Sequence, residues 1–577
     1  MLTQKINKIL KKVSKPARYA GGEFGAVETK TDASFNFLLG FCDVYEVGMS
    51  NLGIKILYGI LNERSDTNCE LCFAPWPDMG EVMKENDIEL FSLQSKTIAR
   101  DFDMLGFSVA SELNFTNVLY MLELAGLKLR AKDRKATDPI IIGGGMGLLN
   151  PMPMADFFDL IVIGEAEEVI NKIADLYVEI KTQSDTKTKI KNDFLKEVAS
   201  LEGVFVPSIH SEEHSKNPNQ KIKKTVVKDL DNVYYPTNPI LPSVEAVHNR
   251  AVLEIFRGCF RGCRFCQAGF VSRPVRFRSS EKLTEIAKEL IEKTGYEEMS
   301  LSSLSTSDYP NLQNLIEQLK PMCSDANVNL SLPSTRLDAF MASHADESRK
   351  SSLTFAPEAG SQRLRDVIKK GITEDDIFNG LENAFKMGYD AVKLYFMIGL
   401  PSETQEDLDA IVELARKIKT HYKKHSKTKR SLSLRFALST FVPKPYTPFQ
   451  WEVQLSYEDI IKTQNELKDR LKKMGVKVAF HDPGTSKVEA GLSRGGSEIA
   501  KVLEKAHSLG IKFDGWTEFF NYEKWVEAFN NEGINLDKYT AQKDFETPLP
   551  WSIINIGISD EFFKDERERA FIEVVKL

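Results

Sequence analysis

Cysteine is scarce in this sequence, with 7 residues among 577. So few cysteines exclude the disulfide framework of a secreted scaffold, and we expect a protein of the reducing cytoplasm. No run approaches 18 consecutive apolar residues, so we expect no membrane-spanning helix and no membrane partner. Positive charge is not in excess either. Against 76 Lys and Arg stand 83 Asp and Glu, a net charge of −7, so the chain is not built to coat nucleic acid.

What is present is the composition of a globular protein, 42% hydrophobic and 28% charged. Five lysines and one arginine precede the first acidic residue, Glu23, and the apolar residues of 2–13 fall on one helical face. We therefore expect residues 1–34 to form a basic amphipathic extension that packs on the body of the protein.

Residues 35–207 alternate short apolar runs with stretches of helical periodicity. Strands are predicted at 36–41, 88–93, 104–110, 139–142 and 159–163. Nearly continuous apolar strands separated by helices, such as 51–61 and 114–124, predict an α/β, Rossmann-like, doubly wound sheet. Residues 208–245 carry prolines and lysines without periodicity and are predicted to be a linker.

A second strand–helix alternation fills residues 246–450. Strands are predicted at 252–256, 298–302, 328–332, 352–355, 391–397 and 432–439. Gly295 is expected to end the helix 281–293, and Ser402 with Gln405 to cap the helix that starts at 403. Six βα units predict a partial barrel, (β/α)6. Residues 451–577 become helical and aromatic-rich, which predicts a mostly helical C-terminal extension.

Three of the seven cysteines, Cys259, Cys263 and Cys266, stand within eight positions, directly after the strand predicted at 252–256. Thiolates select iron–sulfur clusters or zinc. No second pair of ligands stands at the spacing that a closed zinc site needs. Three cysteines in one loop can hold three irons of a [4Fe–4S] cluster and leave the fourth iron open. An open iron is a place for a substrate or cofactor to bind.

The Cys-x3-Cys-x2-Cys spacing at the end of a first barrel strand resembles the radical S-adenosylmethionine (SAM) superfamily, whose open iron binds SAM. The resemblance implies an enzyme that cleaves SAM reductively, and an external one-electron reductant of the flavodoxin or ferredoxin type. In that superfamily the cofactor does the difficult chemistry and the protein binds and orients it. The residues implied to contact SAM are Phe265, Glu358, Gly360, Arg363 and Gly399.

The N-terminal region resembles the cobalamin (B12)-binding domains that precede some radical SAM barrels. Tyr45, in the frame Asp43-x-Tyr45-x-x-Gly48, stands where these domains carry the histidine that ligates cobalt, so that ligand is missing. The resemblance implies cobalamin as a further cofactor and methyl transfer to an unactivated carbon of an unidentified small molecule, RNA or protein. The positions implied to bind cobalamin are Tyr45, Gly48, Ser108, Gly143, Gly144, Gly145 and Glu165.

Two other functions stay open at this point. Cys42, Cys69 and Cys72 are candidates for an auxiliary cluster, as in tRNA or protein methylthiotransferases, although the spacing differs from that family and core thiols are the competing interpretation. A non-catalytic cobalamin or redox sensor is the second alternative. His481 follows an apolar run and is a candidate for proton transfer, against the interpretation that it is structural.

Overall fold

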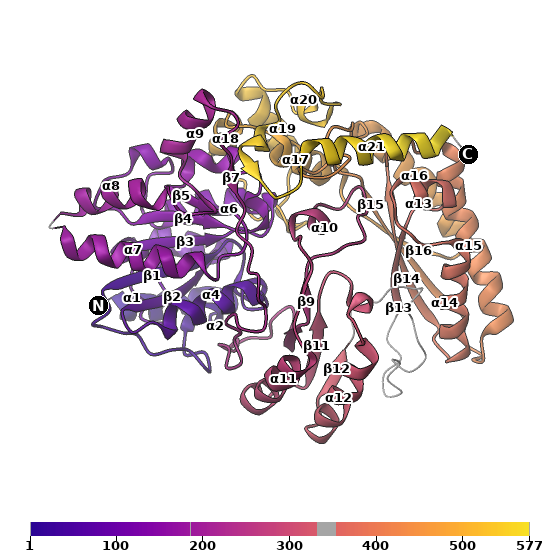
Figure 1. Ribbon diagram of the computed structural model, residues 1–577, viewed down its shortest axis with the longest axis horizontal. Helices are drawn as coiled ribbons and strands as arrows, with labels where there is room; N and C mark the ends of the chain where they lie inside the picture. Colours follow the sequence, from indigo (N-terminus) through magenta and orange to yellow (C-terminus); the bar gives the residue numbers. More distant parts are fainter. Residues whose placement is uncertain (1, 185, 332–352, 576–577) are drawn as a thin grey trace.

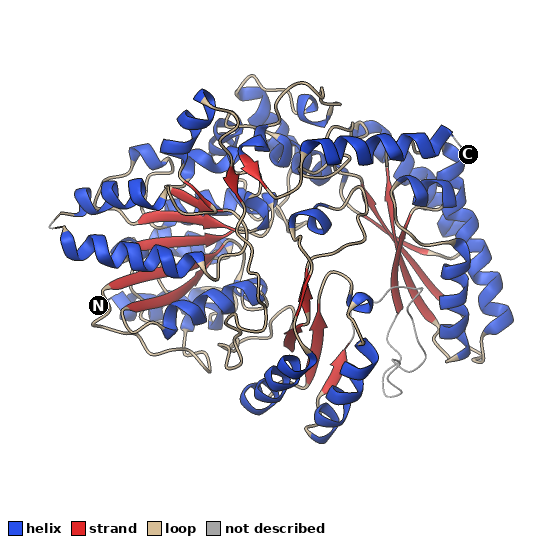
Figure 2. Ribbon diagram, viewed as in Figure 1, coloured by secondary structure: helices blue, strands red, loops and turns tan. Residues whose placement is uncertain are grey.

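Two bodies of parallel β-structure, covered by helices, make up the fold (Figure 1), and their strands alternate with helices along the chain (Figure 2). The computed structural model describes residues 2–184, 186–331 and 353–575. Along these residues no helix is both long and apolar enough to cross a membrane.

The N-terminal body is a six-stranded sheet with the order β2-β1-β3-β4-β5-β6, in which β1 to β5 are parallel and β6 is antiparallel. Its strands are β1 Phe35–Phe41, β2 Thr67–Phe73, β3 Met104–Ser108, β4 Ile140–Gly144, β5 Leu160–Val162 and β6 Val204–Phe205. Alternation along β1 sends Phe37 into one core and Leu38 into the other. Two apolar faces need helices on both sides, so the predicted doubly wound sheet is confirmed.

The helices of this body divide between the two faces. One core holds residues of α4 and α7, and the other holds residues of α5 and α6. The helices are α3 Tyr45–Gly48, α4 Leu52–Glu63, α5 Pro77–Glu85, α6 Phe115–Leu124, α7 Val169–Gln183 and α8 Lys187–Val198. The basic N-terminal helix α1 (Leu2–Ile9) buries Ile6 and Ile9 against the second core, as expected, and the short α2 (Ala17–Ala20) follows it.

One predicted strand of this sheet is wrong. Residues 88–93 form only an isolated bridge, Phe91 to Ile98, and the edge strand is β2 instead. Strand β2 could not be recognised from its sequence, because the polar residues Asn68 and Glu70 interrupt the apolar pattern. Both are buried, and hydrogen bonds from Lys30 N–H (3.0 Å) and Ser95 Oγ (2.7 Å) satisfy them.

The predicted linker, residues 208–245, contains regular structure. Helix α9 (Pro207–Lys216) occupies its start, and β7 (Ile222–Lys223) pairs with β17 (Ile554–Asn555) near the C-terminal end of the chain. This pairing brings the connection between the two bodies against the C-terminal extension.

The described residues of the second body form seven parallel strands in chain order, as a three-stranded sheet, β8-β11-β12, and a four-stranded sheet, β13-β14-β15-β16. Their bounds are β8 Ala251–Glu254, β11 Glu298–Ser302, β12 Asn329–Ser331, β13 Leu353–Glu358, β14 Ala391–Ile398, β15 Ser433–Thr440 and β16 Lys477–Phe480. All six predicted strands are present, and β16 adds a seventh beyond the predicted end of the barrel. Leu332 and Ser352, predicted as strand ends, lie outside the described residues.

Helices cover one side of each of these sheets. They are α11 Ser280–Thr294 and α12 Leu312–Asp325 on the three-stranded sheet, and α14 Glu374–Lys386, α15 Gln405–His425 and α16 Tyr457–Lys473 on the four-stranded sheet. Gly295 ends α11 in the left-handed conformation, as predicted. The predicted cap of α15 is displaced: Thr404 and Asp407 form the capping box, because Ser402 adopts a φ of 64° in the preceding turn.

The C-terminal extension is mostly helical, as predicted, and it packs on the N-terminal body. Its helices are α17 Pro483–Arg494, α18 Ile499–Ser508, α19 Tyr522–Asn531, α20 Asp537–Thr540 and α21 Asp560–Val575. Asp514 accepts a hydrogen bond from Thr116 Oγ1 (2.7 Å), and Trp516 donates to Asp43 (2.9 Å). Half-buried Lys444 pairs with Glu112 of the N-terminal body and Glu489 of α17, so three regions meet at one ammonium group.

Candidate functional site

The three clustered cysteines lie on a loop that leaves the first barrel strand. Strand β9 (Phe256–Arg257) pairs with β10 (Arg276–Phe277), and this hairpin holds the two ends of the segment that contains the loop and helix α10 (Gln267–Val271). Gly258 and Gly262 adopt φ values of 93° and 73°, which a side chain disfavours. The Arg264 N–H donates to the Ile368 carbonyl (3.0 Å), just after α13 (Gln362–Val367), and so anchors the loop to the four-stranded sheet.

The thiols of Cys259, Cys263 and Cys266 are free and partly exposed. Burial raises the pKa of Cys263 to about 11, and the neighbouring thiols add to the rise while Lys370 opposes it. Burial also raises the pKa of Cys266. The three thiols interact electrostatically with one another and with a lysine. They are a suitable donor set for a metal centre, whose binding would displace the thiol protons.

The spacing of these sulfurs favours a cluster over a single ion. Among the described residues, three candidate ligand atoms lie within 4.8 Å of one another at Glu382, His421 and His425, on α14 and α15, and not at the cysteine loop. A single zinc ion needs its ligands gathered around one centre. A [4Fe–4S] cluster binds each thiolate to a different iron, so its sulfurs stand further apart. The donor set therefore fits the cluster.

The C-terminal helix α21 supports the cysteine loop. Buried Arg264 donates to the Val367 carbonyl (2.7 Å) and lies 3.4 Å from the carboxylate of Glu566, which also pairs with Lys369 (3.0 Å). Neither buried charge is left unpaired, so the loop and α21 form one unit. Sequence reasoning missed this contact, since nothing in either segment points to the other.

Three predicted SAM contacts lie around the ends of β13 and β14. Phe265 packs against the apolar cluster that includes Ala359 at the end of β13 and Met397 in β14. Glu358 accepts a hydrogen bond from Lys370 (3.2 Å), the same lysine that influences the cysteine thiols. Gly399 follows β14 with a φ of 77°. The structure thus packs Phe265 of the cysteine loop on this apolar cluster, brings Glu358 to the loop through Lys370, and places Gly399 beside the same cluster.

The other two residues predicted to contact SAM, Gly360 and Arg363, contact neighbouring parts of the barrel. A Cβ on Gly360 would lie 2.4 Å from the backbone nitrogen of Ile411, so only glycine allows this close approach to α15. The Arg363 guanidinium donates to the Ser402 carbonyl (2.8 Å) and pairs with Asp407. Both residues tie the turn after β13 to the start of α15.

Glu403 holds the turn after β14. Its Oε2 accepts a hydrogen bond from the Gly399 N–H at 2.6 Å. Burial raises the pKa of this carboxyl to about 8, and the negative charge of Asp407 adds to the rise. The folded state therefore keeps a proton on Glu403 that the unfolded chain loses at a much lower pH.

This proton predicts a pH dependence of stability. Between the ordinary glutamate pKa of 4.5 and about 8, the folded state binds more protons than the unfolded state, so stability falls as pH rises through that window. Glu403→Gln removes the titrating group and with it this loss of stability at high pH. We expect the variant to unfold at a higher temperature than the wild type at pH 8, with the difference vanishing toward pH 4.5, in thermal unfolding followed by circular dichroism. The exposed Glu466→Gln is the control, and parallel profiles for all three proteins would contradict the assignment.

A second site is a cavity of about 300 Å³ at the carboxyl edge of the six-stranded sheet. Doubly wound sheets bind ligands in the crevice beyond this edge. Four predicted residues line it, Ser108, Gly143, Gly144 and Gly145. The lining residues that were not predicted include Phe37, Leu39, Asn51, Gly53, Ile56, Ile142, Val162, Gly164, Glu167 and Ile170. Most of them belong to β1, α4, β4, β5 and the start of α7, which the fold gathers from separate segments.

The glycine turn keeps this cavity open. Gly145 adopts a φ of 113°, and a Cβ there would lie 2.4 Å from the Val109 carbonyl oxygen. A Cβ on Gly144 would meet nothing closer than the carbonyl oxygen of Val162, at 3.8 Å. Any larger side chain at Gly144 would therefore project into the cavity.

Tyr45 and Gly48 lie outside the lining of the cavity, and their contact with cobalamin stays a prediction. The Tyr45 hydroxyl donates to Glu23 (3.1 Å) and accepts from the Ser243 N–H (2.7 Å). A Cβ on Gly48 would come within 2.3 Å of the ring of Phe73, on which Tyr45 also packs. The segment around Ser243 covers α3, so both residues serve packing.

Glu165 also lies outside the lining, but it connects the cavity to the cysteine loop. Its carboxylate accepts two hydrogen bonds from Arg276 (2.6 and 2.9 Å), and Glu167, in the cavity wall, pairs with Arg257 (2.6 Å). Arg257 and Arg276 belong to the hairpin that holds the cysteine loop. Two charged pairs therefore tie the wall of the cavity to the base of the candidate cluster site.

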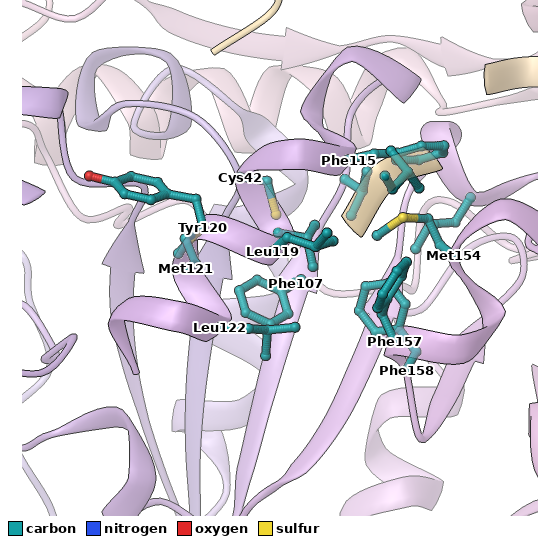
Figure 3. Close-up of a cluster of buried hydrophobic side chains, with 14 of the residues drawn as sticks. Cys42, Phe107, Phe115, Leu119, Tyr120, Met121, Leu122, Met154, Phe157 and Phe158 are labelled. Atoms are coloured by element: carbon teal, nitrogen blue, oxygen red, sulfur yellow. The ribbon is translucent and has the colours of Figure 1, made fainter. Parts of the chain in front are cut away.

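Cys42, Cys69 and Cys72 do not come together. The sulfur of Cys42 lies among Phe107, Leu119 and other apolar side chains (Figure 3), and Cys72 belongs to the same core. Cys69 points into the core on the opposite face of the sheet. Burial raises the pKa of all three thiols. A cluster held by all three is excluded, and the interpretation as core thiols is confirmed.

His481 lies at the end of β16, where its side chain is exposed and its Nδ1 is 3.0 Å from the Ser486 hydroxyl. Its role in proton transfer stays a prediction.

Comparison with known proteins gives matches in both bodies. Residues 53–207 match the N-terminal family of radical SAM proteins, and residues 253–415 match the radical SAM superfamily. The chain is 27% identical over 495 residues to the uncharacterized protein MJ0966 of Methanocaldococcus jannaschii, a match that covers 85% of this chain and 95% of that protein.

Two further similarities cover different shares of the chain. A probable threonylcarbamoyladenosine tRNA methylthiotransferase of Methanocaldococcus jannaschii is 26% identical over 230 residues, which is 37% of this chain and 49% of that protein. Among solved structures, the cobalamin-dependent S-adenosylmethionine radical enzyme OxsB, with aqua-cobalamin and S-adenosylmethionine bound, gives a TM-score of 0.46 at 12% identity. That match covers 94% of this chain and 79% of the OxsB chain.

Proposed function

We propose that this enzyme, which belongs to the radical SAM superfamily, also binds cobalamin and transfers a methyl group to its substrate. One observation carries the proposal. The hairpin of the cysteine loop is joined to the wall of the apolar cavity by the Glu167–Arg257 pair and to Glu165, beside that wall, by Arg276, so two cofactor sites would face the same interior.

Cys259, Cys263 and Cys266 would hold the cluster, with one iron left for SAM. When bound, a [4Fe–4S] cluster supplies the electron that cleaves SAM, and an external one-electron reductant supplies that electron to the cluster. The protein contributes binding and shielding. Phe265 offers an apolar surface beside the loop, and Lys370 offers a positive charge next to the thiolates.

The cavity fits the nucleotide tail of cobalamin. Gly144 and Gly145 bring the backbone close to whatever fills the cavity, and Ser108 offers a hydroxyl at its edge. The apolar walls exclude water from a bound ring system. No histidine is among the described residues of the lining, so the chain would offer no imidazole to cobalt from this cavity.

Anaerobic reconstitution with iron, sulfide and hydroxocobalamin tests this function. We expect about four irons and one cobalt per chain. With a chemical reductant and SAM, we expect 5′-deoxyadenosine, measured by liquid chromatography and mass spectrometry. About eight irons without cobalt would support a methylthiotransferase instead. A fully loaded protein that leaves SAM intact would support a non-catalytic sensor.

A further inference from the structure

Helices α14, α15 and α16 cover one face of the four-stranded sheet, and none of the described helices packs on its other face in the same way. Val392, Leu394 and Phe396 of β14 point into the core beneath α14, α15 and α16. Because side chains alternate along a strand, their neighbours in β14 point the opposite way. Figure 1 shows α14 and α15 on one side of this sheet and the three-stranded sheet on the other. We call the side away from α14, α15 and α16 the inner face.

Three cations stand side by side on the inner face. The strand register pairs Lys393 of β14 with Arg435 of β15, and Arg435 with Lys477 of β16. Adjacent strands are about 4.8 Å apart, so these residues, the cationic row, span roughly 10 Å. Arg435 and Lys477 are exposed and Lys393 is half-buried.

Within the described ranges, no carboxylate forms an ion pair with the cationic row. Among the ion pairs of the described residues none involves its three members, and the Nζ of Lys393 donates instead to the neutral hydroxyl of Tyr395 (2.8 Å). The three-stranded sheet differs, since Glu254 there pairs with Arg257 (2.9 Å) and Glu298 pairs with Arg250 (3.0 Å). Like charges opposite one another on adjacent strands are destabilising, so the cationic row costs free energy until an anion binds.

We infer that the substrate of this enzyme carries a phosphate group, and that Lys393, Arg435 and Lys477 bind it on the inner face. The inference rests on the proposed function, which makes the barrel interior the reaction site. A guanidinium donates two parallel hydrogen bonds to phosphate, and the two ammonium groups add charge on either side. Exposed Tyr395 adds a hydroxyl next to Lys393. A neutral substrate would leave three adjacent cations without a partner in a chain whose net charge is −7.

Binding of inorganic tripolyphosphate to the reconstituted holoenzyme, measured by isothermal titration calorimetry, tests the inference. The test variant combines Lys393→Gln, Arg435→Gln and Lys477→Gln. The control combines Lys462→Gln, Lys468→Gln and Lys472→Gln, three exposed lysines of α16 on the other side of the same sheet. Both variants lose three positive charges, so the change in net charge is matched while the positions of the lost charges differ.

We expect the wild type to bind tripolyphosphate, the test variant to bind at least about tenfold more weakly, and the control to bind within about twofold of the wild type. Arg435→Gln alone should produce a smaller loss and checks the result should the triple variant misfold by circular dichroism. No binding to the wild type, or an equal loss in both triple variants, would overturn the inference. Cleavage of SAM by the wild type is measured separately, so failure of the proposed function is seen independently of phosphate binding.

Discussion

Replacing Cys259, Cys263 and Cys266 together by alanine is expected to abolish the iron–sulfur absorbance and the cleavage of SAM while the chain stays folded. The three thiols are partly exposed on one loop, and Arg264, the hairpin β9–β10 and α21 hold that loop independently of the sulfurs. Iron should fall from about four to near zero per chain, measured by colorimetric iron analysis. A SAM-cleaving cluster in the triple variant would refute the assignment of the ligands.

The matched control uses the core cysteines. Cys69→Ala combined with Cys72→Ala should leave the iron content unchanged, because the two sulfurs point into cores on opposite faces of the sheet. Some loss of thermal stability is expected, since each substitution removes a buried atom. A fall of the iron content to about half would instead revive the auxiliary cluster of a methylthiotransferase.

Gly144→Leu is expected to weaken cobalamin binding by about 10- to 100-fold while the iron content stays the same. A leucine at this position would project into the cavity, and forcing extra side-chain atoms into a filled site costs ~1–3 kcal/mol. Cobalt per chain after reconstitution and desalting, measured by mass spectrometry, is the readout.

The control is Gly515→Leu, at an exposed glycine where a new Cβ would meet nothing within 4 Å. It introduces the same side chain outside the lining of this cavity, so cobalt binding should match that of the wild type. Full cobalt binding by Gly144→Leu would place cobalamin, where bound, outside this cavity and contradict its role.

Much of the fold could be predicted because it depends on local pattern. The strands of the six-stranded sheet other than β2 and β6 are mainly apolar runs between helical stretches, and the six predicted barrel strands are short apolar or alternating runs. Strand β2 was not predicted, because its polar residues Asn68 and Glu70 are buried with hydrogen-bond partners from distant segments. A polar residue buried with a partner has the same local pattern as an exposed one.

The residues of the candidate site also divide into those that local sequence predicts and those that it does not. The cysteine ligands are contiguous, so their spacing alone indicated a cluster. The turn at Gly143, Gly144 and Gly145 was found for the same reason and lines the cavity. The surroundings of Tyr45 could not be predicted, because its hydroxyl bonds to Glu23 and Ser243, which lie in other segments.

By itself the sequence determined the doubly wound sheet, the barrel strands and the three-cysteine loop, because apolar periodicity and ligand spacing act over a few residues. The tertiary structure alone decided which groups from distant segments meet. It placed Glu566 against Arg264, joined Glu165 to Arg276, and aligned Lys393, Arg435 and Lys477 across three strands. Strand register and helix packing set these contacts through many side chains at once, so no local stretch of sequence encodes them.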